Sequence, residues 1–188
     1  MGKLIVVCAP SGSGKSTIIG RLMAADGKRF AFSISATSRA PRGNEVDGKE
    51  YYFMSVEEFK ERVKRGDFIE YQEVYPGCFY GTLKSEVERA WADGKVMFFD
   101  VDVKGGMDIK RLYGEQCLAL FIQPPSVEEL RRRLVARGTD SMEMIERRVA
   151  KAEEELGYAP QFDVVVVNDD LERAVADAKG LIDGFLQD

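Results

Sequence analysis

The sequence of 188 residues contains no histidine. This absence excludes a Ser-His or Cys-His nucleophile pair and any metal site with histidine ligands. Cysteine is scarce: Cys8, Cys78 and Cys117 are odd in number, widely spaced and without a CxxC pair, which argues against a disulfide framework and a zinc site. We therefore expect reduced thiols of the kind found in the cytoplasm.

The sequence also lacks a signal-peptide pattern, internal repeats, a low-complexity linker and any apolar run near the roughly 18 residues that would cross a membrane. We expect a cytoplasmic protein with no membrane partner. The 27 basic and 32 acidic residues give a net charge of −5, which argues against a general nucleic-acid footprint, so no nucleic-acid partner is expected. The hydrophobic content of 45% is enough for one compact unit with inserted lobes, and the oligomeric state stays open.

A stretch rich in glycine and serine follows the first apolar run, at residues 4–7. Residues 8–17 read CAPSGSGKST and lead into a helix-like segment at residues 18–23. This order is typical of a phosphate-binding P-loop, in which glycines let backbone N–H groups turn inward and the helix N-terminus adds the positive end of its dipole. A flexible turn between a strand and a helix is the alternative, but both flanking elements favour the P-loop.

Within this loop the residue types match their chemical tasks. Lys15 would reach the β- and γ-phosphates of a nucleotide, and the Ser16 hydroxyl would face Mg²⁺. Ala9 stands where the strict pattern has glycine, a mild departure that leaves the cradle of Gly12 and Gly14 intact. Phosphoryl transfer also tolerates the absence of histidine, because it depends on positioning and charge neutralisation.

The rest of the chain alternates between short β-branched or aromatic runs and amphipathic segments. Strand-like runs cover residues 29–35, 51–54, 67–74, 96–101, 117–122 and 164–167, of which the last, four valines, is the clearest buried strand. Helices are expected over residues 55–65, 82–92, 104–112, 126–137, 141–156 and 171–186, two of them opening with capping boxes at Ser55 and Ser126. Alternation of this kind predicts a parallel sheet with helices on both faces. The polar, aromatic stretch 33–81 fits this pattern poorly and is interpreted as an inserted lobe.

Several motifs, in their order and spacing, resemble the guanylate kinase family over essentially the whole chain. Besides the P-loop, they are TSRAPR at 37–42 leading through Gly48 to YYF at 51–53, FIEY at 68–71, FYGT at 79–82, DVD at 100–102, PPS at 124–126, RGT at 137–139 and VNDD at 167–170. The resemblance implies transfer of a phosphoryl group from ATP to GMP, giving ADP and GDP with Mg²⁺. It also implies a P-loop NTPase-type α/β fold in one domain, 1–188, with a core (1–33, 86–127 and 152–188), a GMP-binding lobe (34–85) and a helical lid (128–151).

The resemblance implies two nucleotide sites. For ATP the matching residues are Ala9, Pro10, Ser11, Gly12, Ser13, Gly14, Lys15, Ser16, Thr17, Arg133, Arg137 and Asn168. Asn168 would approach adenine, although capping of the last helix explains it as well. For GMP they are Ser35, Arg39, Arg42, Tyr51, Glu70, Tyr80, Gly81, Thr82 and Asp102.

The residue types suit GMP. Arg39 and Arg42 can offer planar forks to a phosphate, to which Tyr51 and Tyr80 add hydroxyl donors. Guanine presents two adjacent donors, N1–H and the 2-amino group, and by resemblance the ionised carboxylate of Glu70 accepts both. Without the family, the two arginines would be part of a solvated loop and Glu70 the outward residue of an alternating strand.

The remaining catalytic candidates concern the transferred group. Asp100 ends an apolar strand, where a parallel sheet places its ligands, and resembles the carboxylate that orients Mg²⁺-bound water; a strand-end turn residue is its alternative. The resemblance favours Arg137 and Arg148, with Arg133 as a further candidate, as lid cations that would neutralise equatorial oxygens on closure. Most of the other charges of residues 143–155 are interpreted as the solvated face of a long helix.

Two other functions compete with a GMP kinase. One is a kinase of another nucleoside monophosphate. The choice between that kinase and a GMP kinase depends on Glu70 and on the loop with Arg39 and Arg42. The other is a guanylate-kinase-like scaffold domain that binds phosphopeptides without catalysis. Such domains have degraded P-loops or lids, whereas this sequence retains Lys15, Ser16 and Asp100 together with Arg137 and Arg148.

Overall fold

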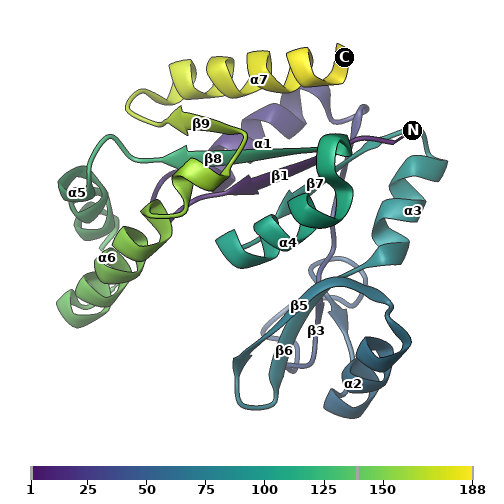
Figure 1. Cartoon of the computed structure of the whole chain (residues 1–188). Helices are drawn as coiled ribbons and strands as arrows, with labels where there is room; N and C mark the ends of the chain where they lie inside the picture. The colour runs from purple at the N-terminus through teal and green to yellow at the C-terminus, as the bar shows by residue number, and fades with distance from the viewer. Residues whose placement is uncertain (1, 139, 188) are drawn as a thin grey trace.

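The computed structural model describes residues 2–138 and 140–187 and contains two sheets (Figure 1). The larger sheet is parallel, with strand order β2-β7-β1-β8-β9. Its strands are β1 (Leu4–Cys8), β2 (Phe30–Phe32), β7 (Val96–Asp100), β8 (Cys117–Gln123) and β9 (Val164–Val167). This confirms the expected α/β fold with a parallel central sheet.

Helices cover both faces of this sheet, and consecutive side chains of the central strand point to opposite faces. From β1, Leu4 and Val6 pack against helices α3 (Lys84–Ala92) and α4 (Val103–Tyr113), while Ile5 and Val7 pack against α1 (Lys15–Asp26) and α7 (Leu171–Gln187). Each fully buried side chain of this size stabilises the fold by about 1.5–3 kcal/mol. The apolar run therefore forms the centre of the core, and its carboxyl end is held rigidly.

The smaller sheet lies below the core in Figure 1, beside helix α2 (Val56–Arg65). It has the order β4-β3-β6-β5, from β3 (Ala36–Thr37), β4 (Tyr52–Phe53), β5 (Phe68–Tyr75) and β6 (Cys78–Leu83). Phe59 of α2 is fully buried and stacks on Phe68 and Phe79, with ring centroids 4.4 and 5.3 Å apart. This separate aromatic cluster lets the smaller sheet fold as a distinct lobe.

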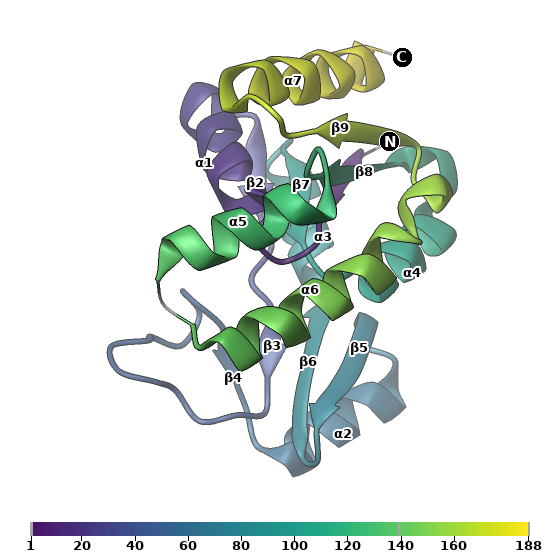
Figure 2. The same ribbon diagram turned by 90° about the vertical axis from the view of Figure 1, so that its left-hand side faces the viewer.

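Helices α5 (Val127–Arg137) and α6 (Met142–Leu156) form a pair at one side of the core, which faces the viewer in Figure 2. They have their own apolar seam, in which Leu130 and Leu134 meet Ile145 and Val149. Short 3-10 turns at Gly114–Gln116 and Ala159–Gln161 complete the elements. No helix in the described ranges is long and apolar enough to cross a membrane.

Of the two hydrogen bonds of each predicted capping box, the one accepted by the serine hydroxyl is present. The hydroxyls of Ser55 and Ser126 accept hydrogen bonds from the backbone N–H of Glu58 and Glu129, at 3.1 Å each. The carboxylate of Glu58 binds Arg62 of the next turn. The serine hydroxyls therefore satisfy one of the free N–H groups at each helix start.

Two secondary-structure predictions are wrong. Residues 82 and 83 do not begin a helix: they end strand β6, which pairs antiparallel with β5 across the Pro76–Gly77 turn. The valine run of β9 is not fully buried, because β9 is the last strand of its sheet and leaves Val165 and Val167 exposed. The first strand-like run also shrinks to Phe30–Phe32.

Candidate active site

The P-loop connects the carboxyl end of β1 to the start of α1. Gly12 and Gly14 have φ angles of 92° and 89°, a left-handed conformation that side chains disfavour. The N-cap of α1, Gly14, provides no side-chain cap, and the first turn contains no acidic residue. The free N–H groups and the positive end of the helix dipole therefore remain available for an anion.

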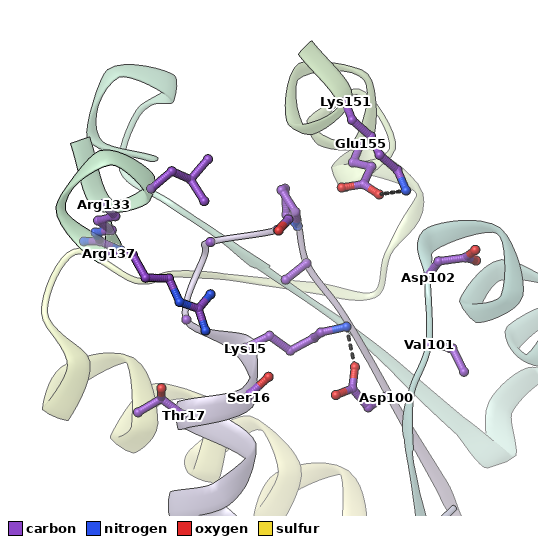
Figure 3. Close-up of a pocket in the computed structure, with 16 residues that line it drawn as sticks. Lys15, Ser16, Thr17, Asp100, Val101, Asp102, Arg133, Arg137, Lys151 and Glu155 are labelled. Atoms are coloured by element: carbon purple, nitrogen blue, oxygen red, sulfur yellow. Dashed lines mark ion pairs between the residues drawn. The ribbon is translucent and has the colours of Figure 1, made fainter. Parts of the chain in front are cut away.

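A cavity of about 720 Å³ opens above this loop (Figure 3). Most of the residues predicted for ATP line it, together with Asp100 and Asp102: Ala9, Pro10, Ser11, Gly12, Gly14, Lys15, Ser16, Thr17, Arg133 and Arg137. Ser13 is buried and does not line the cavity, and neither do Asn168 and Arg148. The structure thus gathers the predicted phosphate-binding residues in one place.

Lys15 and Asp100 form an ion pair on the floor of this cavity. The strand register explains their meeting: β7 runs parallel to β1 with Asp100 opposite Val7, so the carboxylate emerges beside the loop that follows β1. The two side chains are 21% and 27% exposed, so both remain accessible from the cavity. A cation and a carboxylate are consequently held next to the uncapped helix start.

Asn168 lies behind the P-loop and is 5% exposed. Its Nδ2 donates a hydrogen bond of 2.7 Å to the carbonyl oxygen of Ser13. The cap of α7 is Asp170, which accepts from the N–H of Arg173 at 2.9 Å. The capping alternative for Asn168 is therefore wrong, and its amide supports the loop from the last strand.

The predicted lid arginines differ in their contacts. Arg137 extends into the cavity toward Lys15 in Figure 3. Arg133 also lines the cavity, with its Nε donating to Glu129 at 2.7 Å. Arg148 reaches back to the P-loop, where Nη1 lies 3.5 Å from the Ser11 hydroxyl, and pairs with Asp140 at 3.4 Å. Thr139 of the quoted motif lies outside the described residues.

Two residues of this cavity were missed in the sequence. Lys151 and Glu155 of α6 face it from the wall opposite Lys15, with Nζ 3.7 Å from Oε1. Glu155 is 9% exposed, and burial raises the pKa of its carboxyl. The solvated face predicted for most charges of this helix therefore does not include Glu155. No sequence signal separates it from its neighbours, Glu153 and Glu154.

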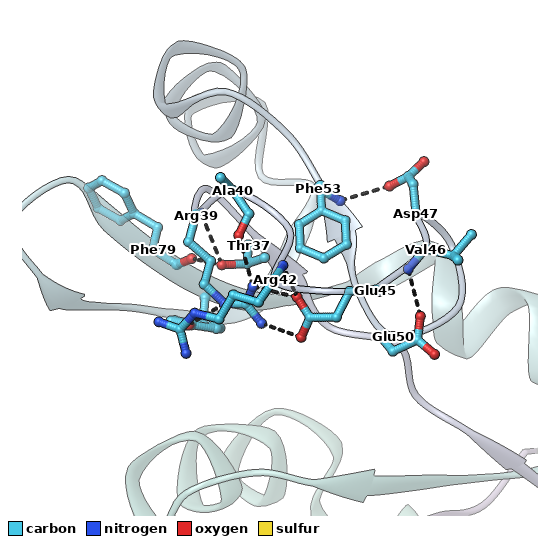
Figure 4. Close-up of polar contacts among 11 residues, drawn as sticks. Thr37, Arg39, Ala40, Arg42, Glu45, Val46, Asp47, Glu50, Phe53 and Phe79 are labelled. Atoms are coloured by element: carbon cyan, nitrogen blue, oxygen red, sulfur yellow. Dashed lines mark hydrogen bonds and ion pairs between the residues drawn. The ribbon is translucent and has the colours of Figure 1, made fainter.

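The second predicted site lies on the smaller sheet, around the guanidinium of Arg39. Its Nη1 and Nη2 bind the two carboxylate oxygens of Glu45, at 2.6 and 2.7 Å, and its Nε donates to the Tyr80 hydroxyl at 3.1 Å (Figure 4). The rings of Tyr51 and Phe53 lie 4.9 and 5.6 Å from the guanidinium carbon. The predicted arginine–tyrosine group is therefore assembled, but its fork is occupied by a carboxylate that the sequence analysis did not select.

Arg42 is exposed, and its side chain makes no hydrogen bond or ion pair within residues 2–138 and 140–187. Only its backbone is tied down: the N–H of Arg42 donates to Glu45 Oε2 at 2.8 Å. The two arginines of the loop are thus unequal. Arg39 is fixed, and the guanidinium of Arg42 is available to a ligand.

Glu70 lies on β5, where β5 meets the start of α4. Thr82 of β6 is fully buried and donates its hydroxyl to Glu70 Oε1 at 2.7 Å. Burial raises the pKa of the Glu70 carboxyl to about 7, and the nearby charges of Asp102 and Asp108 add to the effect. A carboxyl in this setting can change its protonation state near neutral pH.

Asp102 connects the two sites. It lines the P-loop cavity and caps α4, accepting from the N–H of Gly105 at 2.8 Å. Its Oδ1 also accepts from Gln72 of β5 at 3.3 Å. The predicted base-reading residues Glu70, Thr82 and Asp102 therefore lie around the junction of the two sheets.

The last two predicted residues take part through their backbones. Gly81 lies so close to β5 that an added Cβ would be 2.7 Å from the carbonyl oxygen of Glu70. Ser35 accepts a hydrogen bond from the N–H of Tyr52 at 2.9 Å through its carbonyl oxygen. Each position brings neighbouring strands of the smaller sheet together.

Oxygen donors for a metal are few. No group of three or more acidic or cysteine side chains that could hold an ion occurs among the residues the structure describes. The Ser16 hydroxyl and the Asp100 carboxylate line the same cavity. Because Mg²⁺ usually takes only one or two protein oxygens besides phosphates and waters, this pair suits it.

Comparisons with known proteins agree with this geometry. A family model described as guanylate kinase matches residues 1–184. Guanylate kinase from Bacteroides fragilis is 59% identical over 184 residues, covering 98% of this chain and 90% of the relative. That from Porphyromonas gingivalis is 56% identical over 186 residues, covering 99% of each. The crystal structure of guanylate kinase from Anaplasma phagocytophilum is similar with a TM-score of 0.73 and 30% identity, covering 97% of this chain and 85% of that one.

Proposed function

Since the chain belongs to the guanylate kinase family, whose members transfer a phosphoryl group from ATP to GMP, we propose that the P-loop cavity holds ATP and the smaller sheet holds GMP. The chain is an enzyme of purine nucleotide metabolism that converts ATP and GMP to ADP and GDP. The observation that carries the assignment of sites is the cavity itself, in which the uncapped start of α1, Lys15 and Asp100 come together.

In the proposed ATP site, backbone N–H groups among residues 11–17 bind the phosphates, and Lys15 moves from Asp100 to the β- and γ-phosphates. Arg133 and Arg137 contact the nucleotide from the lid side. Asn168 stays a predicted neighbour of adenine, and its bond to Ser13 supports the shape of the loop.

We propose Mg²⁺ as the metal that accompanies ATP, with the Ser16 hydroxyl as a direct ligand and Asp100 binding through water. When bound, the ion would neutralise phosphate charge and orient the terminal phosphate. The release of Lys15 toward ATP would free the Asp100 carboxylate for this task.

In the proposed GMP site, Glu70 accepts hydrogen bonds from N1–H and the 2-amino group of guanine. Thr82 holds one oxygen of that carboxylate, and Asp102 and Ser35 complete the pocket for the base. The phosphate lies near the hydroxyls of Tyr51 and Tyr80, between the arginines of the loop and beside Gly81.

Arg39, Arg42, Tyr51 and Tyr80 do not line the P-loop cavity. Transfer therefore requires the GMP-binding lobe, 34–85, and the lid, 128–151, to close on the core, 1–33, 86–127 and 152–188. Closure brings Arg137 and Arg148 to the transferred group and expels water from it.

The proposed catalytic residues act by charge rather than by proton abstraction. Lys15 and Arg137 neutralise the equatorial oxygens of the transferred group, Arg148 adds charge as the lid closes, and Arg39 holds the accepting phosphate. Asp100 would help to hold the ion through a water molecule. The absence of histidine from the sequence is compatible with this division of tasks.

ATP and GMP are the substrates of the enzyme. We propose a cytoplasmic location without nucleic-acid or membrane partners, supported by the three free cysteines and by the modest net charge of −5.

A coupled assay that offers ATP with GMP, AMP, CMP or UMP tests the assignment. We expect GMP to be preferred, and Glu70→Ala to reduce GMP turnover about ten- to a hundred-fold while leaving the low AMP rate unchanged. Turnover with none of the four would favour a scaffold domain that binds phosphopeptides. An unaltered preference for GMP over AMP in the variant would show that Glu70 does not recognise the base.

A further inference from the structure

The guanidinium of Arg39 is more completely held than a phosphate-binding arginine needs to be. Of its five N–H donors, two bind Glu45 and one binds the carbonyl oxygen of Ala40 at 2.9 Å. A fourth, on Nε, binds the Tyr80 hydroxyl. The side chain is 11% exposed, and two aromatic rings lie near the guanidinium.

The donor that remains is one N–H on Nη2, which lies on the same edge of the planar group as Nε. The Tyr80 oxygen accepts from Nε, so its own O–H is left to donate in another direction. Arg39 and Tyr80 therefore present two donors side by side. The adjacent Nη1–Nη2 edge of the guanidinium, which can also bind an anion in bidentate fashion, is taken by Glu45 (Figure 4).

Glu45 also fixes the second arginine of the loop through its backbone. Its Oε2 accepts from the N–H of Arg42 at 2.8 Å, and its own N–H donates to the carbonyl oxygen of Arg42 at 3.1 Å. One carboxylate thus determines both the direction of the Arg39 side chain and the backbone position from which Arg42 extends.

We propose that Glu45 is a positioning residue for the phosphate site of GMP, and that it stays bound to Arg39 while the phosphate occupies the free edge of Arg39, the Tyr80 hydroxyl and the Arg42 guanidinium. This inference rests on the proposed function. Glu45 and the phosphate would then contact neighbouring edges of one guanidinium, whose positive charge offsets the repulsion between them. Glu45 then acts as a fixed counter-ion and does not compete with the substrate.

The geometry distinguishes this pair from an ordinary surface salt bridge, which contributes little because both partners move freely in water. The Arg39 and Glu45 side chains are 11% and 22% exposed, and the contact is bidentate. The guanidinium of Arg39 and the backbone N–H of Arg42 hold the pKa of Glu45 at about 2, so the carboxylate is ionised throughout the working range of pH.

The test is steady-state kinetics of Glu45→Gln and Glu45→Ala, with each substrate varied in turn. We expect the alanine variant to raise KM for GMP about ten-fold or more and the glutamine variant to raise it less, because glutamine keeps the acceptor but loses the charge. KM for ATP should stay within about two-fold, since the ATP site is built on other elements. Glu58→Gln, which weakens the Glu58–Arg62 pair of α2 in the same lobe, is the matched control and should change neither value.

A double-mutant cycle with Arg39→Ala separates positioning from a general effect on the fold. In that background Glu45→Ala should have little further effect on KM for GMP, and thermal melting should show folded protein throughout. Tighter GMP binding in Glu45→Ala would mean that Glu45 competes with the phosphate and would overturn the proposal, as would an unchanged KM or equal losses for both substrates. Failure of the wild-type protein to phosphorylate GMP would instead refute the proposed function on which the inference rests.

Discussion

At the scale of single residues, two carboxylates of the smaller lobe are held in opposite ways. Glu45 is paired with Arg39, and its pKa is lowered to about 2. Glu70 is buried near other acidic residues, and its pKa is raised to about 7. The first is therefore a permanent charge, whereas the second can lose its charge under mildly acidic conditions.

Glu70 leads to a pH prediction for GMP binding. In the proposed site, the neutral carboxyl keeps a proton on one oxygen and cannot accept from both N1–H and the 2-amino group, so only the ionised form would bind guanine well. With a pKa of about 7 the ionised fraction rises about ten-fold between pH 6 and pH 8, and KM for GMP should fall by up to about the same factor.

The control for this prediction is Glu70→Gln, which does not titrate. Its KM for GMP should be high and nearly independent of pH, apart from the ionisation of the GMP phosphate itself near pH 6. Initial rates at saturating ATP from pH 6 to pH 8 provide the comparison. Parallel profiles for the wild-type protein and the variant would assign the pH dependence to the substrate alone.

Lys15 leads to a prediction about turnover. Removing its ammonium takes one charge from the phosphates and leaves the Asp100 carboxylate beside the loop without its partner. We expect Lys15→Ala to lower kcat at least about a hundred-fold, with the fold kept because the side chain lines the cavity and lies outside the core. Initial-rate assays measure kcat, and circular dichroism checks that the variant is folded. Near-normal turnover would show that the P-loop lysine is not part of the mechanism.

At the scale of elements, the smaller sheet is attached to the core through α3. Glu86 of this helix is 2% exposed, and it accepts from the N–H of Ile34 at 2.8 Å and from the Tyr52 hydroxyl at 2.9 Å. Arg89 also pairs with it at 2.9 Å. One buried carboxylate therefore joins the segment that leaves the core to a strand of the smaller sheet.

We expect Glu86→Ala to lower the free energy of unfolding by about 2–4 kcal/mol, because it leaves an N–H and a hydroxyl unsatisfied and a half-exposed arginine unpaired. Urea denaturation followed by circular dichroism measures the change. Glu88→Ala, at an exposed position of the same helix, should change it by less than about 0.5 kcal/mol. Equal effects of the two variants would show that the buried contacts of Glu86 contribute nothing of their own.

The elements that the sequence predicted well are those whose signal is local. The apolar run of β1, the P-loop and the serine caps of α2 and α5 depend on neighbours a few residues away. Strand β6 was missed because a six-residue run with a glycine becomes a strand only by pairing with β5. The exposure of β9 likewise depends on its place at the edge of the sheet, and a run of valines does not indicate whether a strand is central or at an edge.

The same distinction applies to the candidate site. Lys15 and Ser16 were recognised from spacing within one loop, and the GMP residues from the family resemblance. Glu45, Glu86 and Glu155 were missed because a lone glutamate in a loop or helix is compatible with solvent exposure. Only the fold brings Arg39, the Ile34 backbone and the P-loop cavity to these three carboxylates.

At the scale of the whole molecule, the proposed transfer depends on two lobes that present separate sites. The P-loop cavity belongs to the core and the lid pair, whereas the Arg39 group belongs to the smaller sheet. Asp102 lies at their junction, with one contact to each part. A ligand that engages both sites should therefore bind the closed arrangement and hold the lobes together.

Adenosine and guanosine joined 5′ to 5′ through a bridge that contains the phosphates of both ATP and GMP is such a ligand. A single nucleotide at a hundred times its Kd should stabilise the protein by about 2.7 kcal/mol, or roughly 5–10 °C in Tm for a chain of this size. The joined compound should raise Tm further than ATP and GMP together at the same concentration, because binding of one end brings the other end close to its site.

Differential scanning fluorimetry with the joined compound, the two free nucleotides and a matched compound carrying adenosine at both ends measures this effect. The matched compound tests whether the second site reads guanine, and Glu70→Ala should reduce the shift of the guanosine compound to that of the adenosine one. If the joined compound stabilises no more than ATP alone, its phosphate bridge does not span the two sites, since avidity disappears when both ends cannot bind at once. The arginine loop and the P-loop would then not meet in a closed form, and direct transfer between nucleotides at these two sites would be ruled out.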